Sequence, residues 1–370
     1  SDFMQLADSL NAEPVICVNY SLARYADVDN PVQRAAQYAA DWVRKVNVEM
    51  GLDVKYWEVG NEDHGPWQAG YVVDGDTITG TEYGRDFCVF VDSMKAVDST
   101  IKIGAQVVNE DNGIVTYSGY NWWNKQVLPE VQDKADFLIT HEYFTWNSDP
   151  GQITVNEILS SIPRIGEIKD LVQSNVEKYT DKPADHFPIA MTEYNFRGGL
   201  KTISHVSGLF VAQALGEFIK HDYEMSVIWD MINGYDAESG DHGVLSKGEP
   251  GVEDYTPHAS FFQYYYYEKY FGDRMVYSQS PDADMTTYAS TFSTGETGLV
   301  VVNLSSEKKP VQLQLNDDLS YNQMLWHTVS STDPKNRWFA INGKKSENGK
   351  NGPENYEQIQ LHCSCQGSEN

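Results

Sequence analysis

The stretch VKYWEVGNEDHGPW, residues 54–67, begins as a short apolar strand and ends in a cluster of polar residues. Polar groups at the end of a buried strand cost free energy unless they have partners or a function there. In barrel enzymes of the α/β class, catalytic side chains lie at the carboxyl ends of the strands. Glu62, which directly follows Asn61 at this strand end, is therefore a candidate functional carboxylate.

The pattern of an apolar run with a polar end recurs along much of the chain. The further runs are EPVICVNY (13–20), IKIGAQVVN (101–109), DFLITHEY (136–143), PIAMTEYN (188–195) and MSVIWDM (225–231). Amphipathic segments separate these runs. Strands that alternate with helices predict parallel strands joined by crossover helices.

The clearest amphipathic segment extends from Asn30 to Gly51. Asn30 is expected to cap this helix, with Pro31 in its first position. Gly51 can end the helix in the left-handed region of backbone space. Apolar residues recur at helical spacing and predict its buried face, namely Ala35, Tyr38, Ala39, Trp42, Val43 and Val46.

Two architectures place function at the ends of parallel strands, namely the open doubly wound sheet and the (β/α)8 barrel. No G-x-G-x-x-G motif or P-loop follows any of the runs, which argues against a nucleotide-binding sheet. Single polar residues at several strand ends are typical of a barrel. From about residue 275, period-two runs such as KKPVQLQL predict antiparallel strands. We therefore predict an α/β fold with a catalytic TIM barrel over residues 1–274 and a C-terminal antiparallel β-sandwich over residues 275–370.

Composition and charge exclude several classes of protein. The 370-residue chain has 54 acidic and 27 basic residues, and its net charge of -27 would repel nucleic acid and anionic membranes. No apolar run approaches the roughly 18 residues that a membrane span needs. Its four cysteines form no cluster at metal-ligand spacing, and we expect no metal and no cofactor. The first ten residues, SDFMQLADSL, show no signal peptide.

Two of the strand-end residues are glutamates, Glu62 and Glu193. Either one alone would be interpreted as an ordinary strand-end or helix-capping acid. A pair of carboxyl groups facing each other across a barrel mouth is suited to hydrolysing a glycosidic bond. One carboxyl group protonates the leaving oxygen, while the other attacks the anomeric carbon or activates water. The pair therefore predicts a glycoside hydrolase with an oligosaccharide or polysaccharide substrate.

The stretch VKYWEVGNE, followed later by IAMTEYN, resembles the strand-four and strand-seven motifs of the retaining glycoside hydrolases of clan A. The resemblance implies that Glu62 is the acid/base, that Asn61 binds the 2-hydroxyl group of the sugar, and that Glu193 is the nucleophile. The pKa of Glu62 should then be raised, partly by the charge of Glu193.

The resemblance also implies a strand numbering. If Glu62 closes strand four, EPVICVNY is strand three and MSVIWDM is strand eight, so that strands one and two are missing. Six of eight strands cannot close a barrel without leaving sheet edges open. We therefore expect a fragment whose barrel is completed by a missing N-terminal segment or by another chain.

Within the clan, the segments HEYF, MTEYN, WDMINGY and DHGVLS look like glycoside hydrolase family 86, the β-agarases and β-porphyranases. The expected function is then endo-acting, retaining cleavage of a β-linked galactan by a secreted, extracellular or periplasmic enzyme. The α-L-arabinofuranosidases of family 51 share the KYWxVGNE type of strand and are the alternative. A catalytically inactive barrel that binds carbohydrate is the second alternative.

Sugar binding needs aromatic rings against the C–H face of the sugar and planar polar groups for its hydroxyls. The candidate substrate-binding residues are Asn61, His141, Tyr143, Asn19, Tyr20, Trp67, Trp146, Trp229, Asn195 and Arg197. His141 and Tyr143 are expected to hydrogen-bond Glu193 and to hold it ionised. Arg197 could receive a sulfate group of a sulfated galactan.

Overall fold

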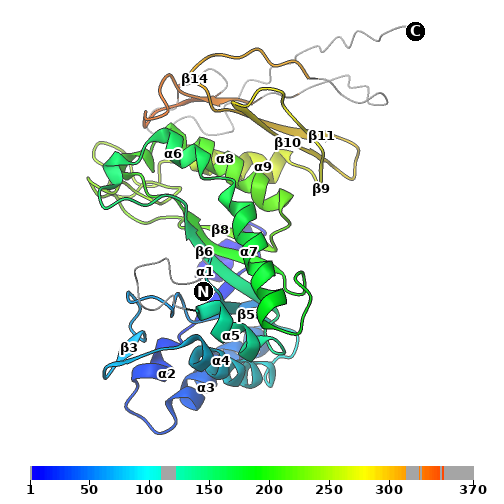
Figure 1. Ribbon diagram of the computed structural model, residues 1–370. Helices are drawn as coiled ribbons and strands as arrows, with labels where there is room; N and C mark the ends of the chain where they lie inside the picture. Colours follow the sequence, from blue (N-terminus) through cyan, green and yellow to red (C-terminus); the bar gives the residue numbers. More distant parts are fainter. Residues whose placement is uncertain (1, 110–121, 314–324, 326, 342–343, 346–370) are drawn as a thin grey trace. The chain divides into compact units, whose positions relative to one another are not determined.

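The computed structural model describes residues 2–109, 122–313, 325, 327–341 and 344–345 (Figure 1). The chain folds into two compact units whose segments interleave along the sequence. The first unit comprises Ser1–Glu142, Gly166–Glu193 and Asp222–Val227. The second comprises Tyr143–Ile165, Tyr194–His221 and Ile228–Asn370. The proposed domain boundary at residue 275 stays a prediction.

A parallel sheet of six strands forms the centre of the first unit, in the order β1-β2-β5-β6-β7-β8. These strands are β1 (Val15–Val18), β2 (Tyr56–Val59), β5 (Lys102–Gln106), β6 (Phe137–Tyr143), β7 (Ile189–Asn195) and β8 (Met225–Ile228). Each corresponds to one of the six apolar runs in the sequence. The sheet curls like part of a TIM barrel, so the α/β expectation is confirmed at this level.

The edges of this sheet are β1 and β8. Within the part of the chain that the structure describes, no strand pairs with the outer side of either. Closure into eight strands, and the missing units that it would require, therefore stay predictions. A small antiparallel hairpin of β3 (Val72–Val73) and β4 (Asp76–Thr77) follows the loop after β2.

The first unit has one helix before β1, and its other helices follow strands as crossovers. In chain order, the helices are α1 (Asp2–Ser9), α2 (Ser21–Tyr25), α3 (Pro31–Val43), α4 (Gly80–Lys95), α5 (Trp123–Val131) and most of α7 (Arg164–Tyr179). The helix α4 packs against both α3 and α5 (Figure 1). Thr79 begins α4 by accepting a hydrogen bond from the backbone of Glu82, which satisfies one of the free N–H groups of the first turn.

The segment after Asn30 differs in part from its prediction. Asn30 lies in the left-handed region with φ of 52° and makes no capping bond with its side chain, although Pro31 does start the helix. A π-helical turn, Arg44–Glu49, extends α3, and Gly51 follows it with φ of 67°.

The predicted buried face of α3 was wrong at its two largest residues. Tyr38 and Trp42 are 55% and 45% exposed. The buried positions are mostly small, namely Ala35, Ala36, Ala39, Ala40 and Val43. Because alanine side chains allow a close helix–helix approach, the small face packs against α4 and the aromatic residues remain outside.

Helices and antiparallel strands form the second unit. The helices are α6 (Val155–Ser160), α8 (His205–Lys220) and α9 (Ala259–Tyr270), with short 3-10 turns at Pro150–Gln152 and Gly199–Lys201. The strands are β9 (Arg274–Val276), β10 (Met285–Thr291), β11 (Thr297–Asn303), β12 (Val329–Ser330), β13 (Ala340–Ile341) and β14 (Lys344–Lys345). They form two three-stranded sheets, β11-β10-β9 and β12-β13-β14. Antiparallel strands thus begin where the sequence predicts them, whereas the β-sandwich itself is not confirmed.

Two contacts attach these sheets to the helices of the second unit. The ring of Tyr288 on β10 lies flat on Gly216 of α8, where an added Cβ atom would come within 2.5 Å of the ring. Its hydroxyl donates to Glu217 at 3.0 Å. From α9, Phe262 packs with Phe339 and Ile341 in a buried cluster. Aromatic residues of α9 therefore serve packing.

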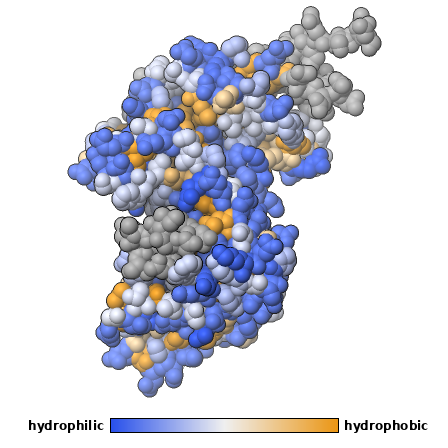
Figure 2. Space-filling view, viewed as in Figure 1, coloured by the Kyte–Doolittle hydropathy of each residue, from blue (hydrophilic) through white to orange (hydrophobic). Residues whose placement is uncertain are grey.

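The outer face in Figure 2 is mostly hydrophilic, as the excess of acidic residues requires, with small apolar patches between. Among the described residues, no helix combines the length and the apolar character that crossing a membrane requires.

Gly104 of β5 provides a test of the sheet packing. A Cβ atom there would lie 2.4 Å from the Phe137 ring and 2.5 Å from Ile139, both on β6. Replacement by alanine must push β5 and β6 apart, and we expect the free energy of unfolding to fall by about 1–3 kcal/mol. This exceeds the ~0.4–1 kcal/mol gained when alanine restricts the unfolded chain. Urea unfolding of the Gly104→Ala protein measures the change.

Lys102→Ala on the same strand is the control, because that side chain is exposed. A loss at Gly104 no larger than the loss at Lys102 would contradict the packing argument.

Candidate active site

A tight turn at Gly60 ends β2 and positions the polar cluster that follows. Gly60 has φ of 75°, and a Cβ atom would meet Asp63 Oδ2 at 1.9 Å and Gln106 Nε2 at 2.9 Å. Only glycine fits this left-handed, crowded position. The backbone N–H of Gly60 still donates to Val18 of the neighbouring strand at 2.9 Å. The chain therefore leaves the sheet abruptly and presents residues 61–64 at the carboxyl end of β2.

Gln106, at the end of β5, holds this turn in place. Its side-chain amide donates to the Val59 carbonyl at 2.8 Å and to Asp63 Oδ2 at 3.0 Å, and it accepts from the Asp63 N–H at 3.0 Å. Tyr83 of α4 donates to the same Val59 carbonyl at 2.8 Å. These groups are buried, so the bonds replace the water that the polar loop would otherwise need.

Glu62 itself adopts a backbone conformation that is rare for its type. Its φ is 49°, in the left-handed region that costs free energy for a residue with a side chain. The Trp67 indole N–H, five residues further on, donates to Glu62 Oε2. The loop thus folds back on its own carboxylate and fixes its direction.

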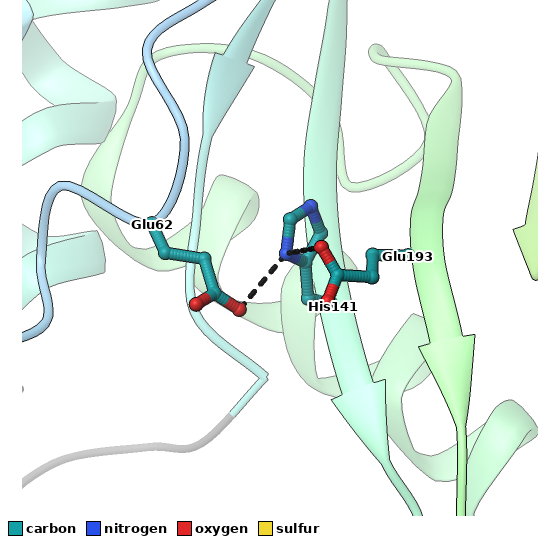
Figure 3. A group of neighbouring side chains, drawn as sticks. All are labelled: Glu62, His141 and Glu193. Atoms are coloured by element: carbon teal, nitrogen blue, oxygen red, sulfur yellow. Dashed lines mark hydrogen bonds and ion pairs between the residues drawn. The ribbon is translucent and has the colours of Figure 1, made fainter. Parts of the chain in front are cut away.

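His141 and Glu193 come from two neighbouring strands, β6 and β7. Figure 3 shows His141 between the two carboxyl groups, with its Nδ1 directed at both. His141 Nδ1 lies 2.9 Å from Glu62 Oε1 and 3.5 Å from Glu193 Oε2. The side chains of the two glutamates are only 19% and 12% exposed. The sequence-predicted pair is therefore brought together around one imidazole.

The contact with His141 sets the charges of this cluster. Burial alone would raise the pKa of Glu62, but the hydrogen bond and charge of His141, together with His64 and Trp67, outweigh it and lower the pKa. Burial would lower the pKa of His141, but Glu62, Glu193 and Glu58 outweigh it and raise the pKa. The expectation of a raised pKa for Glu62 was therefore wrong for the unliganded site, because His141 lies closer to Glu62 than to Glu193.

The same three residues are the one group in the described chain whose geometry could suit a metal ion, with ligand atoms within 4.8 Å of one another. A histidine with a raised pKa between two carboxylates already supplies the positive charge that such a cluster needs. The cluster is therefore suited to proton chemistry.

Two neighbours of the cluster carried no signal in the sequence. Thr192 Oγ1 lies 3.1 Å from His141 Nε2, on the far side of the ring from the glutamates. His64 is buried, and burial lowers its pKa to about 4. A threonine inside an apolar strand looks like any strand residue, and its contact with His141 spans 51 positions of the chain.

The other candidate substrate-binding residues of the first unit differ in burial and in hydrogen-bond partners. The Asn61 side chain is exposed beside Glu62. Asn19 accepts a hydrogen bond from the Leu22 N–H at 3.2 Å and so supports the start of α2. Tyr20 was wrong as a sugar-binding ring, because it is fully buried and its hydroxyl donates to Asp86 at 2.8 Å.

The remaining candidates belong to the second unit. Arg197 places its guanidinium 5.7 Å from the centre of the Tyr143 ring, a cation–π contact. The Asn195 side chain is buried and donates to the Trp229 carbonyl at 2.5 Å, so its amide has a structural role. Trp146 and Trp229 are 67% and 44% exposed, as a ring that stacks on a sugar must be.

The fold is similar to that of several solved glycoside hydrolases. The α-L-arabinofuranosidase of Thermotoga maritima superposes with a TM-score of 0.57 at 19% identity, over 82% of this chain and 63% of that one. A family 51 α-L-arabinofuranosidase from Bifidobacterium longum gives a TM-score of 0.63 at 13% identity, over 92% and 72%. A family 44 endoglucanase from Clostridium thermocellum gives 0.56 at 16% identity, over 81% and 71%.

Sequence comparison finds relatives over a shorter stretch, and no family model matches. The intracellular exo-α-(1→5)-L-arabinofuranosidase 1 of Bacillus subtilis is 28% identical over 148 residues, 39% of this chain. That of Acetivibrio thermocellus is 25% identical over 148 residues. The matched stretch spans 28% and 27% of these relatives, about a quarter of their length.

These comparisons correct three expectations. The resemblance to family 86 finds no support, and the expected agarase or porphyranase activity on a β-linked galactan is overturned by the arabinofuranosidase relatives. Arg197 as a receptor for galactan sulfate is withdrawn with it. The expectation of a secreted enzyme is overturned as well, because the relatives from Bacillus subtilis, Acetivibrio thermocellus and Streptomyces lividans are named intracellular.

The charges of the cluster predict how stability depends on pH. Glu62, whose pKa is lowered, contributes stability above its ordinary value of 4.5 and loses it as the pH falls through the folded pKa. His141, whose pKa is raised, contributes below its ordinary value of 6.5 and loses this as the pH rises through the folded pKa. Between pH 4.5 and pH 6.5, Glu62 and His141 both contribute their full stabilisation. The advantage of the wild type over His141→Gln should therefore be largest there and should decline on either side.

Urea unfolding between pH 3.5 and 9 tests this, whatever the absolute sign of the difference, because a buried ion pair can be neutral overall. His186→Gln, which changes an exposed histidine, is the control and should give a flat difference. A flat difference for His141→Gln would contradict the assigned charges.

Proposed function

We propose that this chain carries the catalytic pair of a retaining, exo-acting α-L-arabinofuranosidase, with Glu62 as acid/base and Glu193 as nucleophile. The observation that carries the proposal is the placement of both carboxyl groups around His141 at the ends of β2 and β7. The relatives and the solved structures with this fold supply the substrate class, a terminal α-L-arabinofuranosyl residue. Because the relatives from Bacillus subtilis and Acetivibrio thermocellus are named intracellular, we propose short arabino-oligosaccharides as substrates.

The spacing of the two carboxyl groups supports retention of configuration. Oxygens of Glu62 and Glu193 lie within 4.8 Å of each other. Retaining enzymes place the two groups roughly 5–5.5 Å apart, whereas inverting enzymes leave roughly 6.5–9.5 Å for a water molecule. Glu193 is therefore close enough to attack the anomeric carbon directly.

Proton transfer in this proposal uses His141. Glu62 must be protonated before it can protonate the leaving oxygen, yet its pKa is lowered in the unliganded site. Transfer of the Nδ1 proton of His141 to Glu62 Oε1 over 2.9 Å makes Glu62 a neutral acid and leaves His141 neutral. Glu193 then attacks as Glu62 gives this proton to the leaving group. In the second step Glu62 takes a proton from the water that cleaves the glycosyl ester.

Substitution of each glutamate tests the assignment. Glu62→Gln and Glu193→Gln should each lower kcat/KM on a 4-nitrophenyl α-L-arabinofuranoside or an α-1,5-linked arabino-oligosaccharide by about 10³-fold or more. Glu224→Gln, an exposed glutamate of the same unit, is the control and should retain activity. Circular dichroism verifies that each variant folds. Full activity in either variant would exclude that residue from catalysis, and an inactive but arabinose-binding wild type would favour the carbohydrate-binding alternative.

The stereochemical course tests the roles of the two residues separately. A Glu193→Ala protein leaves space beside the anomeric carbon, so azide should restore turnover and yield a glycosyl azide of inverted configuration. Proton NMR of the wild-type reaction should show the α-product first, which is net retention. A β-product formed first would contradict the double-displacement mechanism.

A further inference from the structure

A third glutamate, Glu58, lies beneath the catalytic pair and has no part in the mechanism above. It belongs to β2, two residues before Gly60, and is only 6% exposed. A buried carboxyl group costs free energy that an apolar residue of similar size in this strand would not. Its contacts therefore need an explanation beyond packing.

Glu58 reaches the active site through one hydroxyl group. The Thr192 hydroxyl of β7 lies close enough to this carboxyl group to lower its pKa by hydrogen bonding, and Thr192 Oγ1 lies 3.1 Å from His141 Nε2. His141 Nδ1, on the opposite side of the ring, faces Glu62 at 2.9 Å. A continuous line of hydrogen-bonding groups thus runs from Glu58 through Thr192 and His141 to Glu62, all within the first unit.

We propose that Glu58 is a positioning residue that sets the tautomer and charge of His141 through the Thr192 hydroxyl. The geometry of this line does not depend on the substrate. Its consequence for catalysis, namely that Glu58 decides whether Glu62 can be supplied with a proton, rests on the function proposed above.

The argument depends on the single proton of the Thr192 hydroxyl. When Glu58 is ionised, the Thr192 hydroxyl donates its one hydrogen to the Glu58 carboxylate. Oγ1 can then only accept a hydrogen bond from His141, so Nε2 must carry a hydrogen. With a hydrogen on Nδ1 as well, His141 is then a cation between Glu62 and Glu193. When Glu58 is protonated, it donates to Oγ1, which frees the hydroxyl to donate to Nε2. His141 is then neutral, with its one proton on Nδ1.

Charge at Glu58 and charge at His141 therefore change together. Burial raises the pKa of Glu58, while His141 and the Thr192 hydrogen bond act against this rise. The carboxylate of Glu58 in turn helps to raise the pKa of His141. The other titratable groups that face the two residues are Cys17 from β1, Glu62 and His64 from the loop after β2, Tyr83 from α4 and Glu193 from β7.

Histidine side-chain ¹⁵N NMR tests the proposal without any substrate. In Glu58→Gln, the amide carries no charge and can donate to Thr192 as a protonated carboxyl would. We expect the His141 titration to move to lower pH by about one unit, with neutral His141 held in the Nδ1–H form. Thr192→Val should also uncouple the two groups, whereas Thr192→Ser keeps the hydroxyl and should behave like the wild type. Asp86→Asn, which removes a carboxylate that accepts from Tyr20 away from the cluster, is the matched control and should leave His141 unchanged.

Unchanged His141 shifts and titration in folded Glu58→Gln would overturn the proposal. If that variant does not fold, Thr192→Val decides alone, and an unchanged His141 titration there overturns the route through the hydroxyl. The pH profile of kcat/KM should move by the same amount as the NMR titration. Absence of arabinofuranosidase activity would refute the proposed function only, because the NMR result stands without turnover.

Discussion

Two carboxyl groups held this close in a mostly buried site cannot both be ionised unless positive charge lies between them. His141 supplies that charge, with its Nδ1 at 2.9 Å and 3.5 Å from the two glutamates. The rest of the first unit serves this arrangement. Parallel pairing brings the ends of β2, β6 and β7 into one region, the Gly60 turn directs Glu62 back towards it, and Gln106 prevents the turn from relaxing. The left-handed backbone of Glu62 is strain that these contacts hold in place.

The features that depend on a short local sequence pattern could be predicted from the sequence alone. All six strands of the parallel sheet were predicted from apolar runs, because a buried strand with a polar end is a local pattern of fewer than ten residues. The pairing of Glu62 with Glu193 followed from their positions at strand ends. The orientation of α3 did not follow, since Tyr38 and Trp42 have the right spacing but the alanines between them allow the closer contact with α4.

The charge and the substrate of the site depend on contacts that no local pattern records. The pKa of Glu62 is lowered by His141, which lies 79 positions away in the sequence. The hydroxyl of the buried Tyr20 donates a hydrogen bond to Asp86 on α4. The substrate was mistaken for a related reason. Clan members share the strand-end carboxyl groups, whereas the loops that select one sugar differ, and similarity in strand-end segments does not distinguish them. Comparison with whole folds and longer sequence stretches was needed to move the interpretation from galactans to arabinofuranosides.

Burial divides the acids of this region into two groups. Glu58 and Asp63 lie deep, at 6% and 1% exposure, and burial raises the pKa of both, that of Asp63 to about 7. Glu62 lies nearer the surface, where His141 and Trp67 hold it ionised. When neighbouring carboxyl groups have different pKa values, some can remain protonated and donate a proton while others are ionised at the same pH. On the proposal above, an ionised Glu58 keeps His141 a cation, and both outer glutamates can then be ionised beside it.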